Sequence, residues 1–170
     1  MNAKRHCNEL EFEDLSMYGK ILVPIDGSDT SFCGLHEAIK IAKSQGSQIR
    51  LLHIVNEYMF DYLYSPGIYP SNVLEALRES GKKVLHDAEA MLRQQGIEPQ
   101  SVMLETIGGP ASDLILEQAK QWPADLIVMG THGRRGLVRV AMGSDAEEVV
   151  RESPVPVLLV RGTKADQNAA

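Results

Sequence analysis

Residues 20–29 have the sequence KILVPIDGSD, and this short stretch sets the architecture expected for the whole chain. Its first seven residues form an apolar run of the kind that favours a β-strand. Gly27 then turns the chain, and either Ser28 or Asp29 can cap the start of a helix. The residues that follow keep one apolar face as far as Gly46, where we expect the helix to end. The stretch therefore predicts a strand, a tight turn and a helix in direct succession.

The same alternation continues to the end of the chain. Short apolar runs predict further strands at 48–55, 102–106, 125–130 and 155–160. Helical patterns separate them: a long helix capped by Ser71 or Asn72 and ended by Gly96, a short helix after Gly108-Gly109-Pro110, and a helix over 144–152. Strands separated by helices require crossover connections, so we expect an α/β domain with a largely parallel sheet and helices on both of its faces.

Length and composition limit the classes of protein to consider. The chain has 170 residues, of which 44% are hydrophobic and 24% charged, and this suits one globular domain. We expect an N-terminal extension over 1–17, the domain over 18–162 and a short polar tail over 163–170. The net charge of −6 argues against nucleic acid as a partner. No apolar run is long enough for a membrane span, and the charged N-terminus does not resemble a signal peptide, so the sequence predicts a cytoplasmic protein.

Two regions of the sequence suggest a site for an anion. The first predicted strand ends in Pro24-Ile25-Asp26-Gly27-Ser28, and the fourth ends in MGTHGRRG, residues 129–136. Ligands of open parallel sheets bind beyond the carboxyl ends of the strands, and glycine allows backbone N–H groups to approach a phosphate closely. The stretch 130–144 also contains three arginines and no acidic residue before a helix begins at Ser144. A phosphate-binding site is therefore expected at this end of the sheet.

The site does not follow either standard phosphate-binding pattern. The sequence contains no G-x-x-x-x-G-K-[ST], and no G-x-G-x-x-G follows the first strand. The residues instead fit G-x2-G-x9-G-[ST], which is met by Gly130, Gly133, Gly143 and Ser144. This pattern resembles the nucleotide-binding signature of the universal stress protein family. The segments ILVPIDGS, LLHIV and PVPVLLVR resemble the same family in the same order, over about residues 18–161.

The resemblance implies a doubly wound, five-stranded parallel sheet in the order 3-2-1-4-5, often as a homodimer. For this chain, dimerisation would use the strand from Val155 to Val160. The resemblance also implies that ATP lies across the ends of the first and fourth strands, with Mg²⁺ as an accompanying cation. In relatives with this signature, an uncharged residue often stands where this chain has Asp145. An inward-facing carboxylate there would repel phosphates and favour AMP or an empty site, whereas an outward-facing one would support the helix N-terminus.

Each expected contact of the nucleotide is carried over to one position of this chain. Pro24, Ile25 and Asp26 would line the adenosine end, with Asp26 reaching a ribose hydroxyl or a phosphate-bound cation. Ile54 would contact adenine, and Met129 and Gly130 would flank the ribose and phosphates. The phosphates would lie against Gly133, Gly143 and Ser144, with His132, Arg134 and Asp145 as further members of the site.

These expectations lead to one main hypothesis and two alternatives. The main hypothesis is an ATP-binding regulatory protein of the stress response that acts as a nucleotide-dependent binding module. No residue pattern resembles a general base for the γ-phosphate, so hydrolysis is expected to be slow. The alternatives are a dimeric scaffold that binds protein partners without nucleotide, and a slow ATPase. The aromatic segment 56–70 is either a flap over the site, a partner surface or a packed loop.

Overall fold

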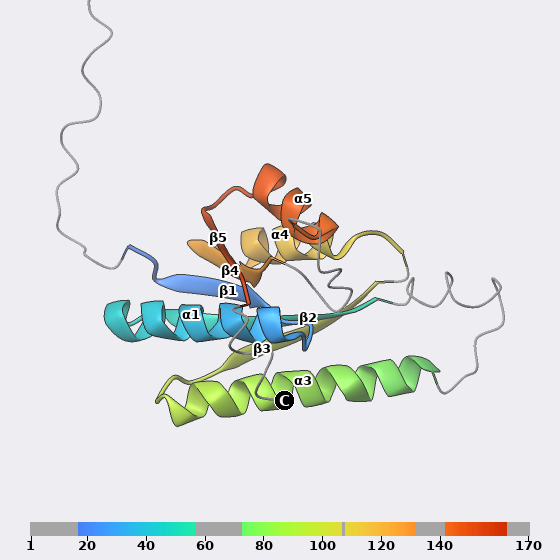
Figure 1. The fold of residues 1–170 in the computed structure, drawn as a ribbon, viewed down its shortest axis with the longest axis horizontal. Helices are drawn as coiled ribbons and strands as arrows, with labels where there is room; N and C mark the ends of the chain where they lie inside the picture. The colour runs from blue at the N-terminus through green and yellow to red at the C-terminus, as the bar shows by residue number, and fades with distance from the viewer. Residues whose placement is uncertain (1–16, 57–72, 107, 132–141, 163–170) are drawn as a thin grey trace, which may run out of the picture.

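The computed structural model describes residues 17–56, 73–106, 108–131 and 142–162 (Figure 1). The predicted extension up to residue 16, the aromatic segment from 57 and the tail from 163 lie outside these residues. The strands are β1 (Lys20–Pro24), β2 (Gln48–Asn56), β3 (Gln100–Thr106), β4 (Leu126–Gly130) and β5 (Val157–Val160). The helices are α1 (Asp29–Gln45), α3 (Val73–Gln94), α4 (Ala111–Gln121) and α5 (Ser144–Glu152).

The five strands form one sheet in the order β3-β2-β1-β4-β5. Every neighbouring pair is parallel, and the register of β1 and β2 places Lys20 beside Gln48 and Pro24 beside Leu52. The expected fold class and strand order are thus confirmed. Because all strands run the same way, their carboxyl ends lie at one end of the sheet and their amino ends at the other.

The helix boundaries follow from capping residues that the sequence contains. Ser28 precedes α1 with extended backbone angles, and its hydroxyl accepts a hydrogen bond from the N–H of Ser31 at 3.2 Å. The helix ends at Gly46, whose φ of 71° is left-handed and therefore favours glycine. Both ends agree with the predicted helix.

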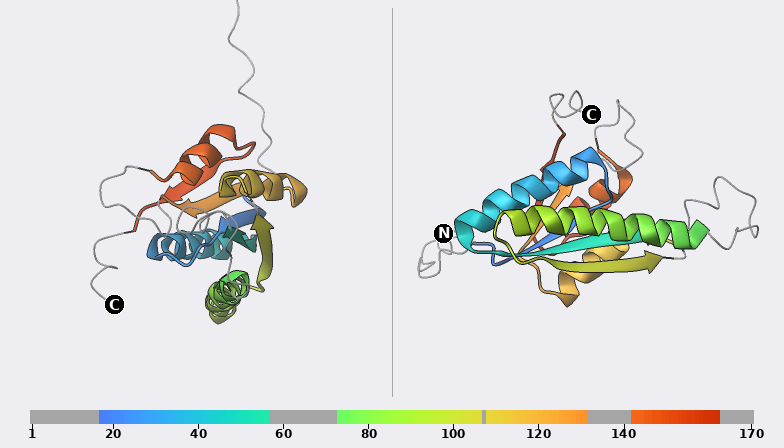
Figure 2. Two further views of the ribbon diagram at one scale, coloured as in Figure 1. Left: turned by 90° about the vertical axis from the view of Figure 1, so that its right-hand side faces the viewer. Right: turned by 90° about the horizontal axis from the view of Figure 1, so that it is seen from below.

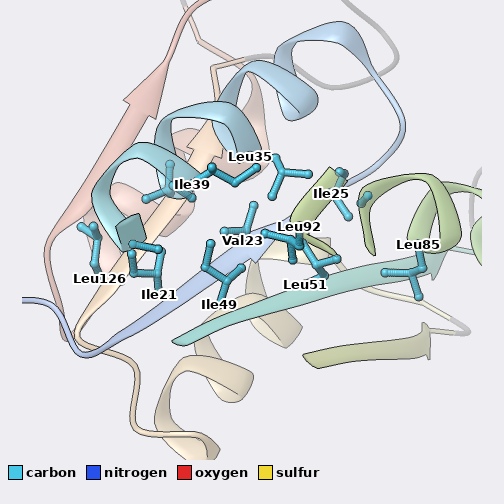
Figure 3. Packing of buried hydrophobic residues seen from close by; sticks show 14 residues of the cluster. Ile21, Val23, Ile25, Leu35, Ile39, Ile49, Leu51, Leu85, Leu92 and Leu126 are labelled. Carbon is cyan, nitrogen blue, oxygen red and sulfur yellow. The ribbon is translucent and has the colours of Figure 1, made fainter. Parts of the chain in front are cut away.

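The helices cover the sheet in two pairs. Figures 1 and 2 show α1 and α3 on one face of the sheet and α4 and α5 on the other. The first face buries aliphatic side chains from the strands against α1 and α3, as Figure 3 shows for Val23, Leu35 and Leu92. Leu22, Leu52 and Ile127 belong to the second cluster, under α4 and α5. Residues that alternate along each strand therefore face opposite helix pairs.

A glycine inside α3 is explained by the histidine beneath it. His53 is 4% exposed, and its Nδ1 lies 2.7 Å from the carbonyl oxygen of Ile25. A Cβ on Gly81 would lie 2.7 Å from the imidazole Cδ2 of His53, which is closer than real Cβ atoms approach other groups. Gly81 therefore gives the imidazole of His53 the space to lie under the helix.

One strand is shorter than the sequence pattern predicts. The apolar run begins at Val155, but β5 begins at Val157. Pro154 and Pro156 have no N–H to donate to a neighbouring strand, and the hydroxyl of Ser153 accepts the N–H of Val155 at 3.2 Å. The predicted strand start was therefore wrong by two residues, because a local turn uses the groups that a strand would need.

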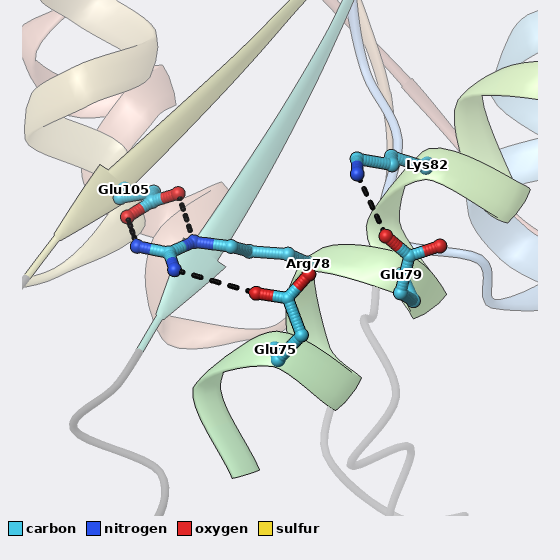
Figure 4. Close-up of polar contacts among 5 residues, drawn as sticks. All are labelled: Glu75, Arg78, Glu79, Lys82 and Glu105. Atoms are coloured by element: carbon cyan, nitrogen blue, oxygen red, sulfur yellow. Dashed lines mark hydrogen bonds and ion pairs between the residues drawn. The ribbon is translucent and has the colours of Figure 1, made fainter. Parts of the chain in front are cut away.

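The opposite edge of the sheet is tied to α3 by charged side chains. Arg78 on α3 donates two hydrogen bonds to the carboxylate of Glu105 on β3, at 2.7 and 2.8 Å (Figure 4). Glu75 lies 3.7 Å from the same guanidinium. The hydrogen bonds from Arg78 hold the pKa of the Glu105 carboxyl below its ordinary value. Charged residues at a sheet edge oppose pairing with another strand, so β3 is protected from edge-to-edge association.

None of the helices within the described residues is long and apolar enough to cross a membrane.

Candidate functional site at the carboxyl end of the sheet

Main-chain hydrogen bonds fix the start of α5 to the end of β4. The N–H of Thr131, the residue after β4, donates to the carbonyl of Val160 at 2.9 Å. The carbonyl of Thr131 in turn accepts the N–H of Gly143 at 2.8 Å. Thr131 therefore joins the ends of β4 and β5 to the residue that precedes α5. The positive end of the α5 dipole is brought to the end of the sheet where ligands of such folds bind.

Three residues form an apolar surface beside this helix start. Pro24, Ile54 and Met129 come from β1, β2 and β4, and strand alternation places them on the face that α4 and α5 cover. Pro24 and Ile54 are half-buried, although each is at or near the end of its strand. Met142, just before α5, packs against the same cluster. Met129 is only 7% exposed, so a flat apolar group such as a purine ring would contact chiefly Pro24 and Ile54. We call Pro24, Ile54 and Met129 the apolar shelf.

The donors at the start of α5 differ from those expected. Gly143 is the N-cap, with φ −74° and ψ 153°, and its N–H is already used by Thr131. By helix geometry, the N–H groups of the first helical residues have no acceptor within the helix. These belong to Ser144, Asp145 and Ala146, and no side chain of the described residues caps them. The donors that this helix start offers to an anion are therefore those of residues 144–146, while Gly143 sets their position.

The carboxylate of Asp145 is held by the neighbouring helix. Its Oδ1 accepts the N–H of Ser112, in the first turn of α4, at 3.3 Å. An anionic side chain at a helix N-terminus is favourable. Here the Asp145 carboxylate lies in the first turn of α5 and also contacts the first turn of α4. This contact supports the starts of both helices, and the effect of Asp145 on a bound phosphate remains a prediction.

Asp26 organises the turn between β1 and α1. Its Oδ1 accepts the N–H of Ser28 at 2.9 Å and the Ser28 hydroxyl at 2.6 Å. Gly27 between them has a φ of 87°, which favours glycine. Asp26 is half-buried at the end of β1, and the contact expected for it with a ribose hydroxyl or a cation remains a prediction. Within the described residues, no three His, Cys, Asp or Glu side chains gather in a way that could hold a metal ion.

Two expected site residues are used by the protein core. Ile25 is 2% exposed and belongs to the cluster under α1 and α3, so its side chain faces away from the apolar shelf. A Cβ on Gly130 would lie 2.8 Å from the carbonyl carbon and oxygen of Thr30 in α1. Gly130 therefore permits the close packing of α1 on β4, whatever it does for a ligand. His132, Gly133 and Arg134 lie outside the described residues.

Sequence reasoning missed Thr131 and Met142. Thr131 is 6% exposed and directly follows a strand whose five residues are all buried. Its place between the end of β4 and the start of α5 makes it the link between them, but its role depends on main-chain atoms, which leave no pattern in side-chain chemistry. Met142 stands next to the predicted Gly143, and only its proximity to that helix start could have indicated it.

The strand order and the helices on both faces define a class of protein, the doubly wound α/β domains. The profile of the universal stress protein family matches residues 17–161, so the chain belongs to this family. Universal stress protein MJ0531 of Methanocaldococcus jannaschii is 36% identical over 151 residues, which are 89% of this chain and 86% of that protein. Universal stress protein YxiE of Bacillus subtilis is 32% identical, over 85% of this chain and all of its own length.

Solved structures agree with this assignment. The structure of the protein MJ0577 has a TM-score of 0.75 and 26% identity, covering 87% of this chain and 99% of that one. Two further structures hold adenine nucleotides: a universal stress protein in complex with cAMP, at TM-score 0.64, and one from Archaeoglobus fulgidus in complex with dAMP, at 0.59. They are 22% and 23% identical over 86% and 85% of this chain, and cover 99% and 98% of their own, so they show that the fold is shared.

Proposed function

We propose that the chain is an adenine-nucleotide-binding module, with ATP or AMP as its ligand, that acts in regulation of the stress response. The observation that carries the proposal is the position of the apolar shelf beside the start of α5. Pro24, Ile54 and Met129 offer apolar contact for a purine, and the N–H groups of Ser144 and Asp145 offer donors for phosphate. One ligand that is apolar at one end and anionic at the other would satisfy both.

Two further observations support a nucleotide. The carboxylate of Asp145 accepts the N–H of Ser112 at 3.3 Å, so it is held against the first turn of α4. Two universal stress proteins of this fold were solved with cAMP and dAMP, which share the adenine base and a phosphate. Occupancy of the site would act as the regulatory signal, and Mg²⁺ bound by the phosphates would accompany ATP, with Asp26 as the carboxylate proposed to reach this cation.

The test separates the main-chain donor from the side chain at one position. Proline is favoured as the first residue of a helix, and Gly143 already has the extended angles that a residue before proline needs. Ser144→Pro removes the N–H and the hydroxyl while preserving the helix, and Ser144→Ala removes only the hydroxyl. If an N–H bonds a phosphate, S144P should weaken ATP binding about 10- to 100-fold, and more than S144A does.

Calorimetry on nucleotide-free protein measures these affinities. Circular dichroism of both variants serves as the control that α5 is intact. If the wild type binds neither ATP nor AMP at millimolar concentration, the proposed function is wrong. If S144P binds ATP as tightly as the wild type, the phosphates do not lie at the start of α5.

A second candidate, a homodimer formed through β5, rests on the exposed edge of the sheet. Among the described residues β5 pairs only with β4, and the side chain of Leu158 is 38% exposed. Val150 on the adjacent α5 is 46% exposed. The edge at β3 is blocked by Arg78 and Glu105, whereas β5 has apolar side chains and an unpaired edge, which favours association. Sedimentation of the wild type should show a dimer that Leu158→Lys dissociates; a monomeric wild type would contradict this pairing.

A further inference from the structure

Two cationic side chains share one aromatic ring at the amino end of the sheet. The guanidinium carbon of Arg50 lies 4.5 Å from the centre of the Trp122 ring, and the Nζ of Lys20 lies 5.6 Å from it. Both distances are within the range of cation–π attraction. Trp122 follows α4 and is 7% exposed, so the ring is held in place by the core. We call Lys20, Arg50 and Trp122 the cationic cluster.

The sheet register explains why the two cations meet. Leu22 pairs with Arg50 across β1 and β2, and Lys20 lies two residues before Leu22 on the same face of β1. The main chain of Lys20 is also tied to the turn after α4, since its N–H donates to Asp125 Oδ2 at 2.9 Å. Its carbonyl accepts the N–H of Asp125 at 2.8 Å. The cluster is therefore built into the fold.

Neither cation has a carboxylate within ion-pair distance in the part of the chain that the structure describes. Arg50 donates from Nη2 to the side-chain oxygen of Gln100 at 2.9 Å, and its Nε is buried with no acceptor among the described residues. Burial lowers the pKa of the Arg50 guanidinium below its ordinary value. Two positive charges on one ring repel each other, so an anion that binds beside both is favoured.

The chain itself contains an acidic segment close to this cluster in sequence. Residues 9–14 are ELEFED, with four carboxylates in six residues. Asp14 precedes Lys20 by six residues, and six residues of extended chain reach about 20 Å. A segment tethered this closely has an effective concentration of about a millimolar, which favours it over free anions of similar affinity. Charge, reach and concentration therefore point to the same segment.

We propose that Lys20 and Arg50, held on Trp122, bind carboxylates of the acidic segment 9–14. The interaction would attach the N-terminal segment to the end of the sheet opposite the proposed nucleotide site. It does not depend on nucleotide binding. High salt would weaken it, because the attraction between partly exposed charges is screened.

The test uses the single tryptophan of the chain as a reporter. Trp122 gives the one indole N–H signal in a ¹⁵N–¹H spectrum of the full chain. The variant Glu9→Gln, Glu11→Gln, Glu13→Gln, Asp14→Asn removes the four charges without shortening the chain. We expect the indole signal to shift in this variant. In the wild type, rising salt should move the signal toward the position that it has in the variant.

A matched control changes the net charge equally. It replaces four exposed acids on α3 and α5 by their amides: Glu75, Glu79, Asp87 and Glu152. In this control the indole signal should keep its wild-type position. A peptide of residues 8–16 added to the neutralised 9–14 variant should restore the wild-type shift, and Lys20→Gln should abolish this restoration.

Three outcomes would overturn the proposal. The first is an indole signal that does not move on neutralisation of 9–14, and the second is an equal movement in the control. The third is a restoration by inorganic phosphate but not by the 8–16 peptide, which would make the cluster a site for free anions.

Discussion

The two ends of one sheet face differ in chemistry although the same two strands build both. On the side that α4 and α5 cover, every second residue of these strands faces the same helices. From the amino to the carboxyl end this face carries a cation, then a leucine, then a residue of the apolar shelf. These residues are Lys20, Leu22 and Pro24 on β1, and Arg50, Leu52 and Ile54 on β2. The amino end places long cationic side chains over an indole ring. The carboxyl end places short or apolar side chains beside the start of a helix.

This difference shows how a parallel sheet separates two kinds of anion recognition. At the carboxyl end the positive charge comes from the main chain, because helices begin there. At the amino end helices finish with exposed carbonyl groups, so positive charge has to come from side chains such as Lys20 and Arg50. Main-chain donors suit a phosphate held at close range, whereas long cationic side chains suit carboxylates of variable position.

The largest effect, a loss of stability, is expected at Gly130, where α1 packs closely against the carboxyl end of β4. Gly130→Ala places a Cβ 2.8 Å from backbone atoms of Thr30, which cannot rotate away. We expect a loss of about 2 to 3 kcal/mol in the free energy of unfolding. The control at the amino end is Gly46→Asn: nothing lies within 4 Å of a Cβ there, and asparagine tolerates a φ of 71°. Its cost should stay under about 1 kcal/mol.

Thermal and urea unfolding measure this difference. For a domain of this size, Gly130→Ala should lower the Tm by roughly 4 to 12 °C. Equal losses for the two variants would mean that the contact between α1 and β4 is not what limits the side chain at Gly130.

A substitution in the apolar shelf should have a smaller effect than Gly130→Ala, and the effect should be on ATP binding. Ile54 and Leu104 are neighbours on β2 and β3 and are both half-buried against the same cluster. Shortening either to alanine removes similar apolar contact with the core, but only Ile54 belongs to the shelf. Ile54→Ala should weaken ATP binding about 3- to 10-fold, because partial loss of apolar contact costs roughly 1 kcal/mol.

Leu104→Ala serves as the matched control, and its ATP affinity should stay within about twofold of the wild type. Calorimetry on both variants decides the matter. Equal weakening by the two substitutions would assign the effect to the core and not to contact with adenine.

The smallest effect is expected when a residue at the amino end of the sheet is substituted and ATP binding at the carboxyl end is measured. Lys20→Gln removes one cation from the cationic cluster but touches none of the shelf. ATP affinity should change by less than about twofold, since the charge lies at the far end of the strand and is screened over such a distance. A tenfold loss of ATP affinity in this variant would show that the nucleotide phosphates lie at the amino end.

The sequence alone predicts the fold almost completely. Periodicity places all five strands and the helices of the described residues, and Gly46 and Gly96 mark helix ends with left-handed φ angles of 71° and 75°. The start of β5 was missed because Ser153 and the prolines form a local turn that apolar character does not reveal. The strand order came from the resemblance to the universal stress protein family, since local patterns do not specify which strands pair.

The candidate site could be predicted only in part. The sequence indicates Gly143 and Ser144 as a helix start, but it does not show that Thr131 uses the N–H of Gly143. It groups Gly130 with a ligand, whereas the structure also gives it a packing role against Thr30. A glycine in a motif can serve the backbone or the ligand, and only the position of the neighbouring elements distinguishes them.

One titration tests the central claim most directly, because it observes both ends of the sheet at once. ATP is added to ¹⁵N-labelled, nucleotide-free protein, and the backbone amide signals of residues 144–146 and the indole signal of Trp122 are followed. The nucleotide proposal predicts saturable shifts at Ser144, Asp145 and Ala146 and an unmoved indole. Shifts of the Trp122 indole without movement at 144–146 would contradict it and place the anion site at the amino end.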